Sequence, residues 1–517
     1  MKKLLVFVSL LSFVAVSCGK KGKEDEKKPA KSEKKTEKKD PKKVDKKVEP
    51  KKDDKGEFKF IEAKNVKPED EKINCNSYSC TISVVTKKVK EEIEKRDQYK
   101  KLTIIFKSKI KNSYFKTIQN LPWVKRLSLS SLYIDNIKPL KNLKELEKLT
   151  ISYIKTDKTG AKVTIDLAPI AGLSKMKYLS ISNTTISGVE NIGKLVALKE
   201  LSIYYADLPD LKWISSLKSL KNIYFSKNKI ADLAPLKGMT AVERLSLRGN
   251  DSIKDYSPLS TLTNMTYLEL SSTAIADLKV LAPLTKLETL YIAGSKGKIA
   301  DISPLKALVA IRYLTLNGNK DIKDISAVSV MKDLYRLSIS NTGVSDIKAV
   351  KDLKKLSSIE LNSTKIKDLK ALAKVTSLSR IEARKTAITD LSPLKGLSRL
   401  SSLYVDETKI KDLTPLKGLS EMSTLNVSKT KIKDIKALEK MPKLWWLYIN
   451  ETEVKDLSPL KKAEKLSSLE IRKTKIKDLK PLFGLKKMSS IYISRGFPKD
   501  KLDKFKKALP GCRVSAW

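Results

Sequence analysis

A pattern that recurs about every 22 residues, from residue 121 to residue 496, constrains the fold of this chain more than any other feature. Each copy holds an apolar-x-apolar segment, a polar turn residue, another apolar residue and an aspartate. A fixed period of this length predicts a solenoid, because each copy can bury its apolar face only against the next one. The segments predict seventeen strands, which begin their apolar pairs at Leu127, Leu149, Leu179, Leu201, Ile223, Leu245, Leu268, Leu290, Leu314, Leu337, Ile359, Ile381, Leu403, Leu425, Leu447, Leu469 and Ile491.

Each part of the repeat has a physical role. Alternating apolar residues point to one side of a short strand, and the apolar residue after the turn, such as Ile432, fills the same core from the opposite side. An aspartate then precedes a segment such as Leu-x-Pro-Leu, and we expect its carboxylate to act as the N-cap of a short helical turn. These aspartates are Asp232, Asp277, Asp301, Asp324, Asp346, Asp368, Asp390, Asp412, Asp434, Asp456 and Asp478.

The polar turn position carries asparagine in three copies and threonine in most others. Buried backbone groups need hydrogen-bond partners, so we expect these side chains to bond to the backbone of the neighbouring coil. The asparagines are Asn228, Asn250 and Asn319, and the threonines are Thr184, Thr273, Thr342, Thr364, Thr386, Thr408, Thr430, Thr452 and Thr474.

The full pattern, Leu-x-x-Leu-x-Leu-x-x-(Asn/Thr)-x-Ile-x-Asp-Leu-x-Pro-Leu, resembles the 22-residue repeat of the internalin-like leucine-rich-repeat proteins. It covers about three quarters of the chain. The resemblance implies an α/β repeat protein, a leucine-rich-repeat solenoid. Its parallel β-sheet would lie on the concave face, short helical or 3-10 turns on the convex face, and caps at both ends. No ligand follows from it, because the family shares a scaffold rather than a partner.

The beginning of the chain resembles a bacterial lipoprotein signal. A basic start is followed by an apolar run, Leu4 to Val16, which is shorter than the about 20 residues of a membrane-spanning helix. The run ends in Ala15-Val16-Ser17-Cys18-Gly19, so the resemblance implies a signal peptide over residues 1–17 and lipidation of Cys18. Ala15 departs from the leucine that such signals prefer, and an ordinary secretory signal cut nearby is the alternative.

The lipoprotein resemblance also implies a location. We expect the protein in a bacterial cell envelope, lipid-anchored (to the outer membrane in a diderm organism) and facing the periplasm or the exterior. Beyond Cys18, residues 18–55 consist mostly of Lys, Glu, Asp and Pro. Such a stretch has too few apolar residues to fold, which predicts a disordered tether.

A solenoid exposes its core at both ends, so each end needs a cap. Residues 56–120 form the expected N-terminal cap, with a strand over 58–61, a hairpin over 73–85, and a helix over 87–98 that is followed by the apolar segment 102–106. Residues 497–517 form the C-terminal cap, with a helix over 499–509 and a last strand. Cys75 and Cys80 flank a short turn, and in an oxidising envelope we expect them to form a disulfide. Cys512 has no evident partner and is expected to be a buried thiol.

The composition argues against catalysis. The chain has no histidine, and its four cysteines include no CxxC pair. These absences exclude Ser-His-Asp triads, Cys-His dyads and the usual zinc sites, and no phosphate loop or carboxylate dyad appears. We therefore predict a protein that is not an enzyme and needs no cofactor or metal.

The formal charge of +47 would usually point to nucleic acid, an anionic surface or acidic partners. Most lysines fall in the turn motif and in segments of the convex side. A nucleic-acid binder would gather charge and aromatic residues in one groove, so no nucleic-acid partner is expected.

The outward positions of the strands are rich in tyrosine and arginine, with one tryptophan. These residue types dominate interface energies, although aromatic residues also favour strands for their own sake. Two patches stand out, Tyr204 with Tyr205 and Tyr224, and Arg380, Glu382, Arg384 and Tyr404 with Trp446 and Tyr448. The complete predicted partner-binding set is Tyr178, Tyr204, Tyr205, Tyr224, Arg248, Tyr267, Tyr291, Tyr313, Arg380, Glu382, Arg384, Tyr404, Trp446, Tyr448 and Tyr492.

Two functions fit this sequence. The first is a non-enzymatic module that binds a protein or peptide through the concave face, acts as a monomer and reaches the membrane through its lipid anchor. The second is an envelope structural protein whose basic convex surface contacts anionic lipid or polymer. Contacts of the second kind would weaken at moderate salt, because exposed charges are screened.

Overall fold

The computed structural model describes residues 72–75, 79–94, 103–106, 110–157 and 159–516. The chain divides into two compact units, residues 1–51 and 52–517, and every described residue belongs to the second. The expected signal peptide, Cys18, the tether and the strand over 58–61 lie outside the described residues.

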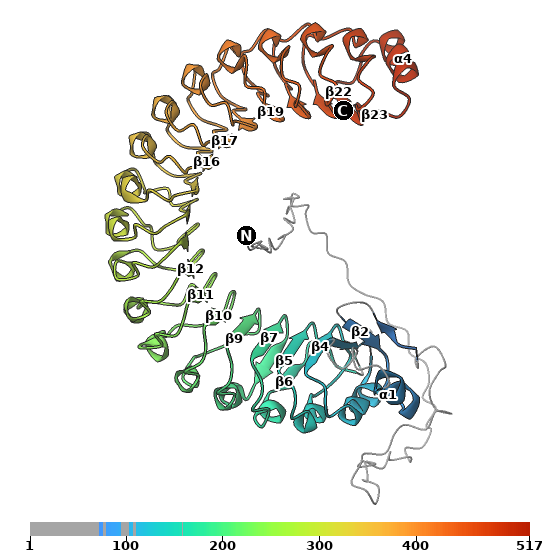
Figure 1. Ribbon diagram of the computed structural model, residues 1–517, viewed down its shortest axis with the longest axis vertical. Coiled ribbons are helices and arrows are strands. Elements are labelled where there is room, and N and C mark those ends of the chain that lie inside the picture. Colours follow the sequence, from blue (N-terminus) through green and yellow to red (C-terminus); the bar gives the residue numbers. More distant parts are fainter. Residues whose placement is uncertain (1–71, 76–78, 95–102, 107–109, 158, 517) are drawn as a thin grey trace, which may run out of the picture. The chain divides into compact units, whose positions relative to one another are not determined.

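The described residues form one sheet of 21 strands (Figure 1). β1 pairs antiparallel with β2, and every later strand is parallel to its neighbour. The strands are β1 (Asn74–Cys75), β2 (Ser79–Ile82), β3 (Thr103–Phe106), β4 (Arg126–Ser130), β5 (Lys148–Ser152), β7 (Tyr178–Ser182), β9 (Glu200–Tyr204), β10 (Asn222–Tyr224), β11 (Arg244–Ser246), β12 (Tyr267–Glu269), β13 (Thr289–Tyr291), β14 (Tyr313–Thr315), β15 (Arg336–Ser338), β16 (Ser358–Glu360), β17 (Arg380–Glu382), β18 (Ser402–Tyr404), β19 (Thr424–Asn426), β20 (Trp446–Tyr448), β21 (Ser468–Glu470), β22 (Ser490–Ile493) and β23 (Arg513–Ala516).

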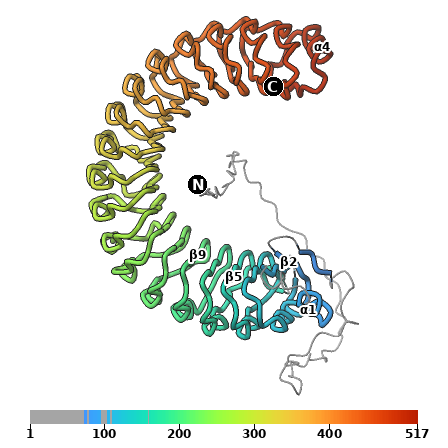
Figure 2. The backbone as a smooth tube through the Cα atoms, in the orientation of Figure 1, coloured from blue at the N-terminus to red at the C-terminus, as the bar shows by residue number. Residues whose placement is uncertain are grey.

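All seventeen predicted strands are present, as β4, β5, β7 and β9 to β22. Each strand contains the apolar residue from which it was predicted. On adjacent strands these apolar residues lie directly opposite each other, as Leu245 does with Leu268 and Leu290 with Leu314. Within this unit the coils fan, so that the strands line the concave side (Figure 2). The fold is a leucine-rich-repeat solenoid, as predicted.

The convex side carries short 3-10 helices, one for each coil (Figure 1). These helices are short because 3-10 geometry is rarely sustained beyond about one turn. They are η3 (Lys116–Asn120), η4 (Lys138–Asn142), η5 (Ala168–Ile170), η6 (Val189–Lys194), η7 (Ile214–Ser216), η8 (Ala234–Leu236), η9 (Ser257–Thr261), η10 (Lys279–Leu281), η11 (Ser303–Ala307), η12 (Ser326–Val330), η13 (Lys348–Val350), η14 (Lys370–Leu372), η15 (Ser392–Leu394), η16 (Thr414–Leu416), η17 (Lys436–Leu438), η18 (Ser458–Leu460) and η19 (Lys480–Leu482). None of the helices in the described ranges has the length and apolarity that crossing a membrane requires.

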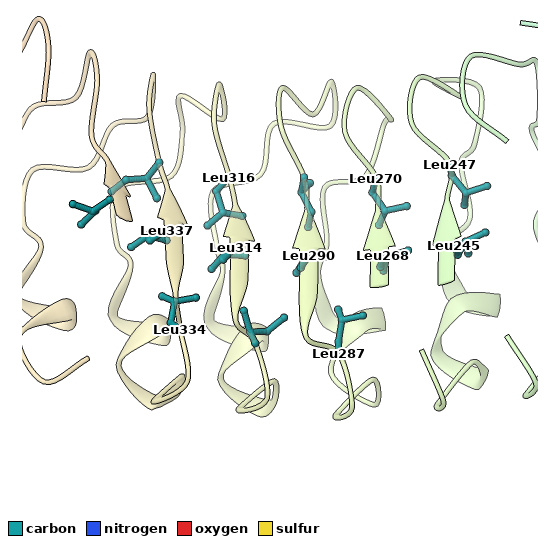
Figure 3. Packing of buried hydrophobic residues seen from close by; sticks show 14 of the residues in the cluster. Leu245, Leu247, Leu268, Leu270, Leu287, Leu290, Leu314, Leu316, Leu334 and Leu337 are labelled. Atoms are coloured by element: carbon teal, nitrogen blue, oxygen red, sulfur yellow. The ribbon is translucent and has the colours of Figure 1, made fainter. Parts of the chain in front are cut away.

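The core is a set of leucine and isoleucine rows that run along the solenoid. Leu268, Leu290 and Leu314 lie on adjacent strands, point inward and are fully buried (Figure 3). Leu270 and Leu316 belong to the second row, which lies two residues after the first row along the chain. Each side chain therefore packs against the same position of the next coil, and a large-to-alanine change in such a row costs about 2–5 kcal/mol.

One repeat is longer than the others, with 30 residues between Leu149 and Leu179. The additional residues contribute β6 (Thr164–Asp166), which pairs in parallel with β8 (Thr185–Ser187) in a separate two-stranded sheet. The insertion therefore adds a small second ladder without disturbing the pairing of β5 with β7.

The repeat aspartates hold the start of the 3-10 turns, but one position earlier than predicted. Asp434 Oδ1 accepts the backbone N–H of Lys436, the first residue of η17, at 3.0 Å, and Ile435 is the N-cap residue. All eleven predicted aspartates make this bond to the residue two positions later. The expectation of an N-cap was thus wrong in position, because the carboxylate closes an Asx turn across the residue between.

The threonines of the turn do not behave as predicted either. Thr364 Oγ1 donates to the carbonyl oxygen of Leu361 in its own coil, at 2.7 Å, and the same bond to the residue three positions earlier recurs at the threonines from Thr273 to Thr474. A hydroxyl on a short side chain reaches its own turn and not the coil before it. Thr184 does bond to the backbone of the preceding coil, by accepting the N–H of Ile154 at 3.3 Å.

At the N-terminal end, β1 and β2 form a hairpin in which Cys75 and Cys80 are paired and joined by a disulfide. The helix α1 (Lys87–Glu94) buries Val89 and Ile93, and the short helix α3 (Asn112–Phe115) buries Phe115. β2 and β3 extend the repeat sheet in parallel register. This cap therefore continues the sheet, rather than only covering its end.

At the C-terminal end, the helix α4 (Lys499–Ala508) places Phe505, which is fully buried, 6.5 Å from Phe483 between ring centroids. β23 then pairs in parallel with β22. The thiol of Cys512 is buried, and burial raises its pKa to about 11. It is therefore protonated at neutral pH and unreactive.

Candidate functional site

The concave face is defined here by three outward positions per coil: the first and third residues of each strand from β7 to β22, and the residue two positions after the third. (In β7 and β9 the fifth strand residue takes that last place.) None of these positions from β7 to β22 holds a lysine, although Lys148 occupies the corresponding first position of β5. In a chain with 106 lysines and arginines, the concave face is thus set apart from the rest of the surface.

The predicted partner-binding residues occupy this face, with one exception. Tyr178 and Trp446 are first strand residues, and they are 40% and 43% exposed. Tyr205 instead lies in the turn after β9, with a φ of 50° and 58% exposure. The remaining members lie on the concave positions of their coils, and apart from the exposed Arg248 they are half-buried: Tyr204, Tyr224, Tyr267, Tyr291, Tyr313, Arg380, Glu382, Arg384, Tyr404, Tyr448 and Tyr492.

One set of these side chains, Tyr224, Arg244, Tyr267, Glu269 and Tyr291, is packed into a continuous row that we term the tyrosine cluster. Arg244 Nε donates to the Tyr224 hydroxyl at 3.0 Å, and its guanidinium lies 4.4 Å from the centroid of the Tyr267 ring. Tyr267 and Tyr291 meet edge to face with centroids 5.7 Å apart. Such contacts add stabilisation beyond the buried area, so the rings are held in place before any ligand arrives.

Burial changes the acidity of the tyrosines in this region. It raises the pKa of Tyr204 to about 12, and it also raises the pKa of Tyr267, whose hydroxyl donates to Glu269 at 3.3 Å. The nearby Tyr224 acts on the pKa of Tyr204 in the same direction as burial. Tyr204 and Tyr267 therefore remain neutral hydrogen-bond donors throughout the physiological range of pH.

A second set, Arg380, Glu382, Arg384 and Tyr404, forms what we term the arginine cluster. The Arg380 and Arg384 guanidiniums lie 4.6 and 4.4 Å from the centroid of the Tyr404 ring. Arg380 Nη2 is 2.5 Å from Glu382 Oε1. The predicted grouping of these four residues is thus present in the structure.

The carboxylate at the centre of the arginine cluster stays ionised. Burial by itself would raise the pKa of Glu382, but hydrogen bonds from Asn362 and Arg380, with the charges of Arg380 and Arg384, hold that pKa below its ordinary value. Asp406 differs: burial outweighs the attraction of Arg384, 3.5 Å away, and raises the Asp406 pKa. The pKa values of the two carboxylates beside Arg384 are therefore shifted in opposite directions.

Tyr448 and Trp446 extend this region on β20. Burial raises the pKa of Tyr448, and the nearby Glu470 and Tyr404 act in the same direction. Trp446 packs against Trp445 with ring centroids 5.9 Å apart.

Three exposed aromatic residues were missed by the sequence analysis: Tyr153, which directly follows β5, and Tyr335 and Trp445. Tyr335 is 47% exposed and lies 5.9 Å from Tyr313 between centroids, and Trp445 is 40% exposed. Tyr335 and Trp445 each directly precede a strand. In the sequence analysis, outward residues were chosen only from the alternating positions within the strands and just after them, so this position was not included. Comparison of the repeats would have found them, because neighbouring coils place Ser357 and Ser423 there.

A shallow hollow of about 270 Å³ lies beside Tyr335, lined also by Glu288, Ala310, Arg312, Asp333 and Lys355. Its charges are of both signs and it is open to solvent. Within the described part of the chain, no group of three or more acidic or cysteine side chains is arranged to hold a metal ion. The geometry on the concave face is that of an extended contact surface.

Known structures share this architecture. An internalin, InlF, from Listeria monocytogenes is 27% identical, with a TM-score of 0.50 over 64% of this chain and 88% of that one. A leucine-rich-repeat protein of Leptospira interrogans is 21% identical and has a TM-score of 0.65, over 77% of this chain and 97% of that one. The functional domain of InlJ from Listeria monocytogenes is 19% identical, with a TM-score of 0.52 over 64% of this chain and 71% of that one.

Sequence comparison is less informative. No family model matches the chain. A Caenorhabditis elegans protein named "Putative RNA-binding protein EEED8.10" is 28% identical over 166 residues, which is 30% of this chain. The match spans about a fifth (22%) of that protein's length.

Proposed function

We propose that this protein is a non-enzymatic binding module that takes a protein or peptide ligand on its concave face. The observation that carries the proposal is the segregation of residue types: tyrosine, arginine and tryptophan gather on the concave face, where no position holds a lysine. Protein interfaces show the same bias, with Tyr, Trp and Arg enriched and Lys depleted. Strand propensity alone would not replace lysine with arginine.

The rigidity of this surface supports the same function. Binding loses free energy whenever flexible side chains must be ordered. Here Arg244 is fixed between Tyr224 and Tyr267, and Arg384 is stacked on Tyr404. These side chains are already ordered in the free protein, so a ligand would meet a preformed surface.

We further propose that the module is displayed on a bacterial envelope by lipidation of Cys18. Support comes from the sequence, in which an apolar run ends at Ala15-Val16-Ser17-Cys18 and a charged stretch follows. A lipid chain would shift the protein into the detergent phase of a two-phase extraction, and Cys18→Ala would shift it to the aqueous phase. Detergent-phase recovery of the Cys18→Ala protein would contradict the anchor.

The test of the binding surface uses a triple variant, Tyr204→Ala with Tyr224→Ala and Tyr448→Ala, in the full chain. The matched control is Lys367→Ala with Lys411→Ala and Lys433→Ala, since these lysines are exposed in the turns. Both proteins and the wild type are used to capture envelope proteins of the source bacterium at low and at moderate salt, after nuclease treatment. We expect the tyrosine variant to lose the captured proteins while the lysine variant retains them.

The opposite pattern would favour the structural alternative. Capture that survives the tyrosine changes, and is lost at moderate salt or in the lysine variant, would assign binding to the basic surface. Capture that disappears after nuclease treatment would assign it to nucleic acid.

A further inference from the structure

The concave face contains the same four-residue arrangement twice, with each residue 88 positions from its counterpart. An asparagine follows one strand, a glutamate and an arginine lie on and after the next strand, and a tyrosine lies on the third. The first quartet is Asn362, Glu382, Arg384 and Tyr404, and the second quartet is Asn450, Glu470, Arg472 and Tyr492.

The first quartet is held together by the asparagine. Asn362 Nδ2 donates to Glu382 Oε2 at 2.9 Å, and Asn362 Oδ1 accepts the backbone N–H of Arg384 at 2.9 Å. The Arg384 guanidinium lies over the Tyr404 ring and 3.9 Å from Glu382 Oε2. The asparagine thus fixes both the carboxylate and the backbone from which the arginine extends.

The second quartet repeats these contacts. Asn450 Nδ2 donates to Glu470 Oε2 at 2.7 Å, and Asn450 Oδ1 accepts the N–H of Arg472 at 2.8 Å. Arg472 lies 5.0 Å from the Tyr492 ring centroid and 3.9 Å from Glu470 Oε2. The same bonds in the same order indicate one local design used at two places.

Both arginines have unused hydrogen-bonding capacity. Nε of Arg384 and Nε of Arg472 are buried without a hydrogen-bond partner, and the 3.5 Å approach of Asp406 to Arg384 lacks hydrogen-bond geometry. A ligand carboxylate would therefore approach the terminal Nη1–Nη2 edge of each guanidinium rather than its Nε. The arginine side chains are 37% and 34% exposed, whereas Glu382 and Glu470 are 12% and 19% exposed. A ligand therefore meets guanidinium groups whose supporting carboxylates lie beneath them.

Building on the proposed function, we propose that the two quartets bind two acidic side chains of one extended polypeptide ligand. A guanidinium stacked on a ring keeps its planar edge free for bidentate pairing with a carboxylate. The quartets lie four strands apart, which is about 19 Å at about 4.8 Å per strand. An extended peptide rises about 3.3 Å per residue, so the two acidic residues would be about six positions apart.

The charge balance favours a peptide over an anionic polymer. Between β16 and β22 the concave charges are three arginines and four carboxylates: Arg380, Arg384, Arg472, Glu360, Glu382, Asp406 and Glu470. A polyanion binds through an excess of positive charge, which this region lacks. Two discrete, oriented guanidiniums suit two discrete carboxylates.

The test begins with a random twelve-residue peptide library displayed on phage and selected on the full chain. We expect enriched peptides to carry two Asp or Glu residues five to seven positions apart. Enrichment without such pairs, or no enrichment, would overturn the proposal.

The best enriched peptide is then synthesised and its Kd measured against variants. Arg384→Ala and Arg472→Ala should each weaken binding by about tenfold. When one acidic residue of the peptide is replaced with its amide, the arginine that had bound that residue should no longer contribute, so its change to alanine should have no further effect on the Kd. Arg384→Lys, which keeps the charge, should still weaken binding because the planar edge is lost. Arg399→Ala is the control: it removes an equal charge from an exposed site off the concave face, and binding should not change.

Thermal unfolding of each variant separates lost contacts from lost folding. If the effect of Arg384→Ala simply adds to the effect of each of the two acid-to-amide changes in the peptide, Arg384 pairs with neither acidic residue, and the proposed pairing is contradicted. Polyphosphate and phosphatidylglycerol vesicles are the competing probes, and tighter, Arg384-dependent binding of either would overturn the peptide assignment.

If the tyrosine triple variant loses its captured proteins but the arginine variants retain theirs, this inference fails and the proposed function stands. If no substitution on the concave face changes the captured proteins, the proposed function itself fails.

Discussion

The side chain of Asn250 joins two coils: its Nδ2 donates to the carbonyl oxygen of Phe225, one coil earlier, at 2.6 Å. Its Oδ1 also accepts the N–H of Ile230 in that earlier coil, at 3.3 Å, and the residue is fully buried. Thr364 at the corresponding position bonds only within its own coil. Asparagine therefore stabilises the stacking of coils, whereas threonine stabilises a single turn.

Asn250→Ala should consequently destabilise its region more than Thr364→Ala does. The asparagine change leaves buried backbone groups of two coils unpaired, at about 2–3 kcal/mol, against about 1 kcal/mol for one lost bond within a turn. Hydrogen exchange reports the local opening free energy, from the amides of β10 and β11 for Asn250→Ala and from those of β15 and β16 for Thr364→Ala. Equal effects of the two substitutions would contradict the distinction.

Most of the fold could be predicted because it depends on the repeat alone. The burial of Leu290 and its equivalents follows from their recurrence about every 22 residues, at the same inward position of each strand. The position of the Asp434 bond could not be predicted, because a capping pattern in the sequence does not distinguish an α-helical N-cap from an Asx turn that starts a 3-10 helix. The reach of Thr364 depends on a difference of one atom in side-chain length.

The concave face was only partly predictable. Alternation along a strand identified Arg384 and Tyr404 as outward, but their stacking depends on which rotamers the neighbouring coil allows. Tyr335 precedes its strand and therefore fell outside the alternation. The role of Asn362 could not be seen, because it acts through Glu382 and Arg384 on later coils.

The turns also contain backbone strain that can be tested. Ser363 and Ser272 have φ values of 54° and 56°, a left-handed conformation that costs a residue with a Cβ atom about 1 kcal/mol relative to glycine. Ser363→Gly and Ser272→Gly should each raise the urea midpoint of unfolding. Ser420→Gly is the control, since that exposed serine lacks a positive φ, and it should lower the midpoint slightly. A lower midpoint for Ser363→Gly would contradict this account.

Asp412 should contribute stability that is lost in acid. Hydrogen bonds from the hydroxyl and the backbone N–H of Thr414 hold its pKa below the ordinary value. The stabilisation is therefore complete above the unfolded-state pKa of about 3.9 and disappears as the pH falls through the folded-state pKa. Asp412→Ala should cost about 1 kcal/mol at neutral pH and progressively less as the pH falls below the unfolded-state pKa, as measured by urea unfolding across that pH range. Asp412→Asn, which keeps an acceptor, should cost less at neutral pH.

Asp406 should show the opposite dependence on pH. Burial raises its folded-state pKa above the unfolded value, despite Arg384 nearby. Below about pH 3.9 the carboxyl is neutral in both states, and as the pH rises through the folded-state pKa its ionisation destabilises the fold. Asp406→Asn should thus unfold at a higher urea concentration than the wild type at pH 7, and at the same concentration near pH 3. A variant less stable than the wild type at pH 7 would show that the attraction of Arg384 exceeds the effect of burial, and that the carboxylate is needed to hold the arginine over Tyr404.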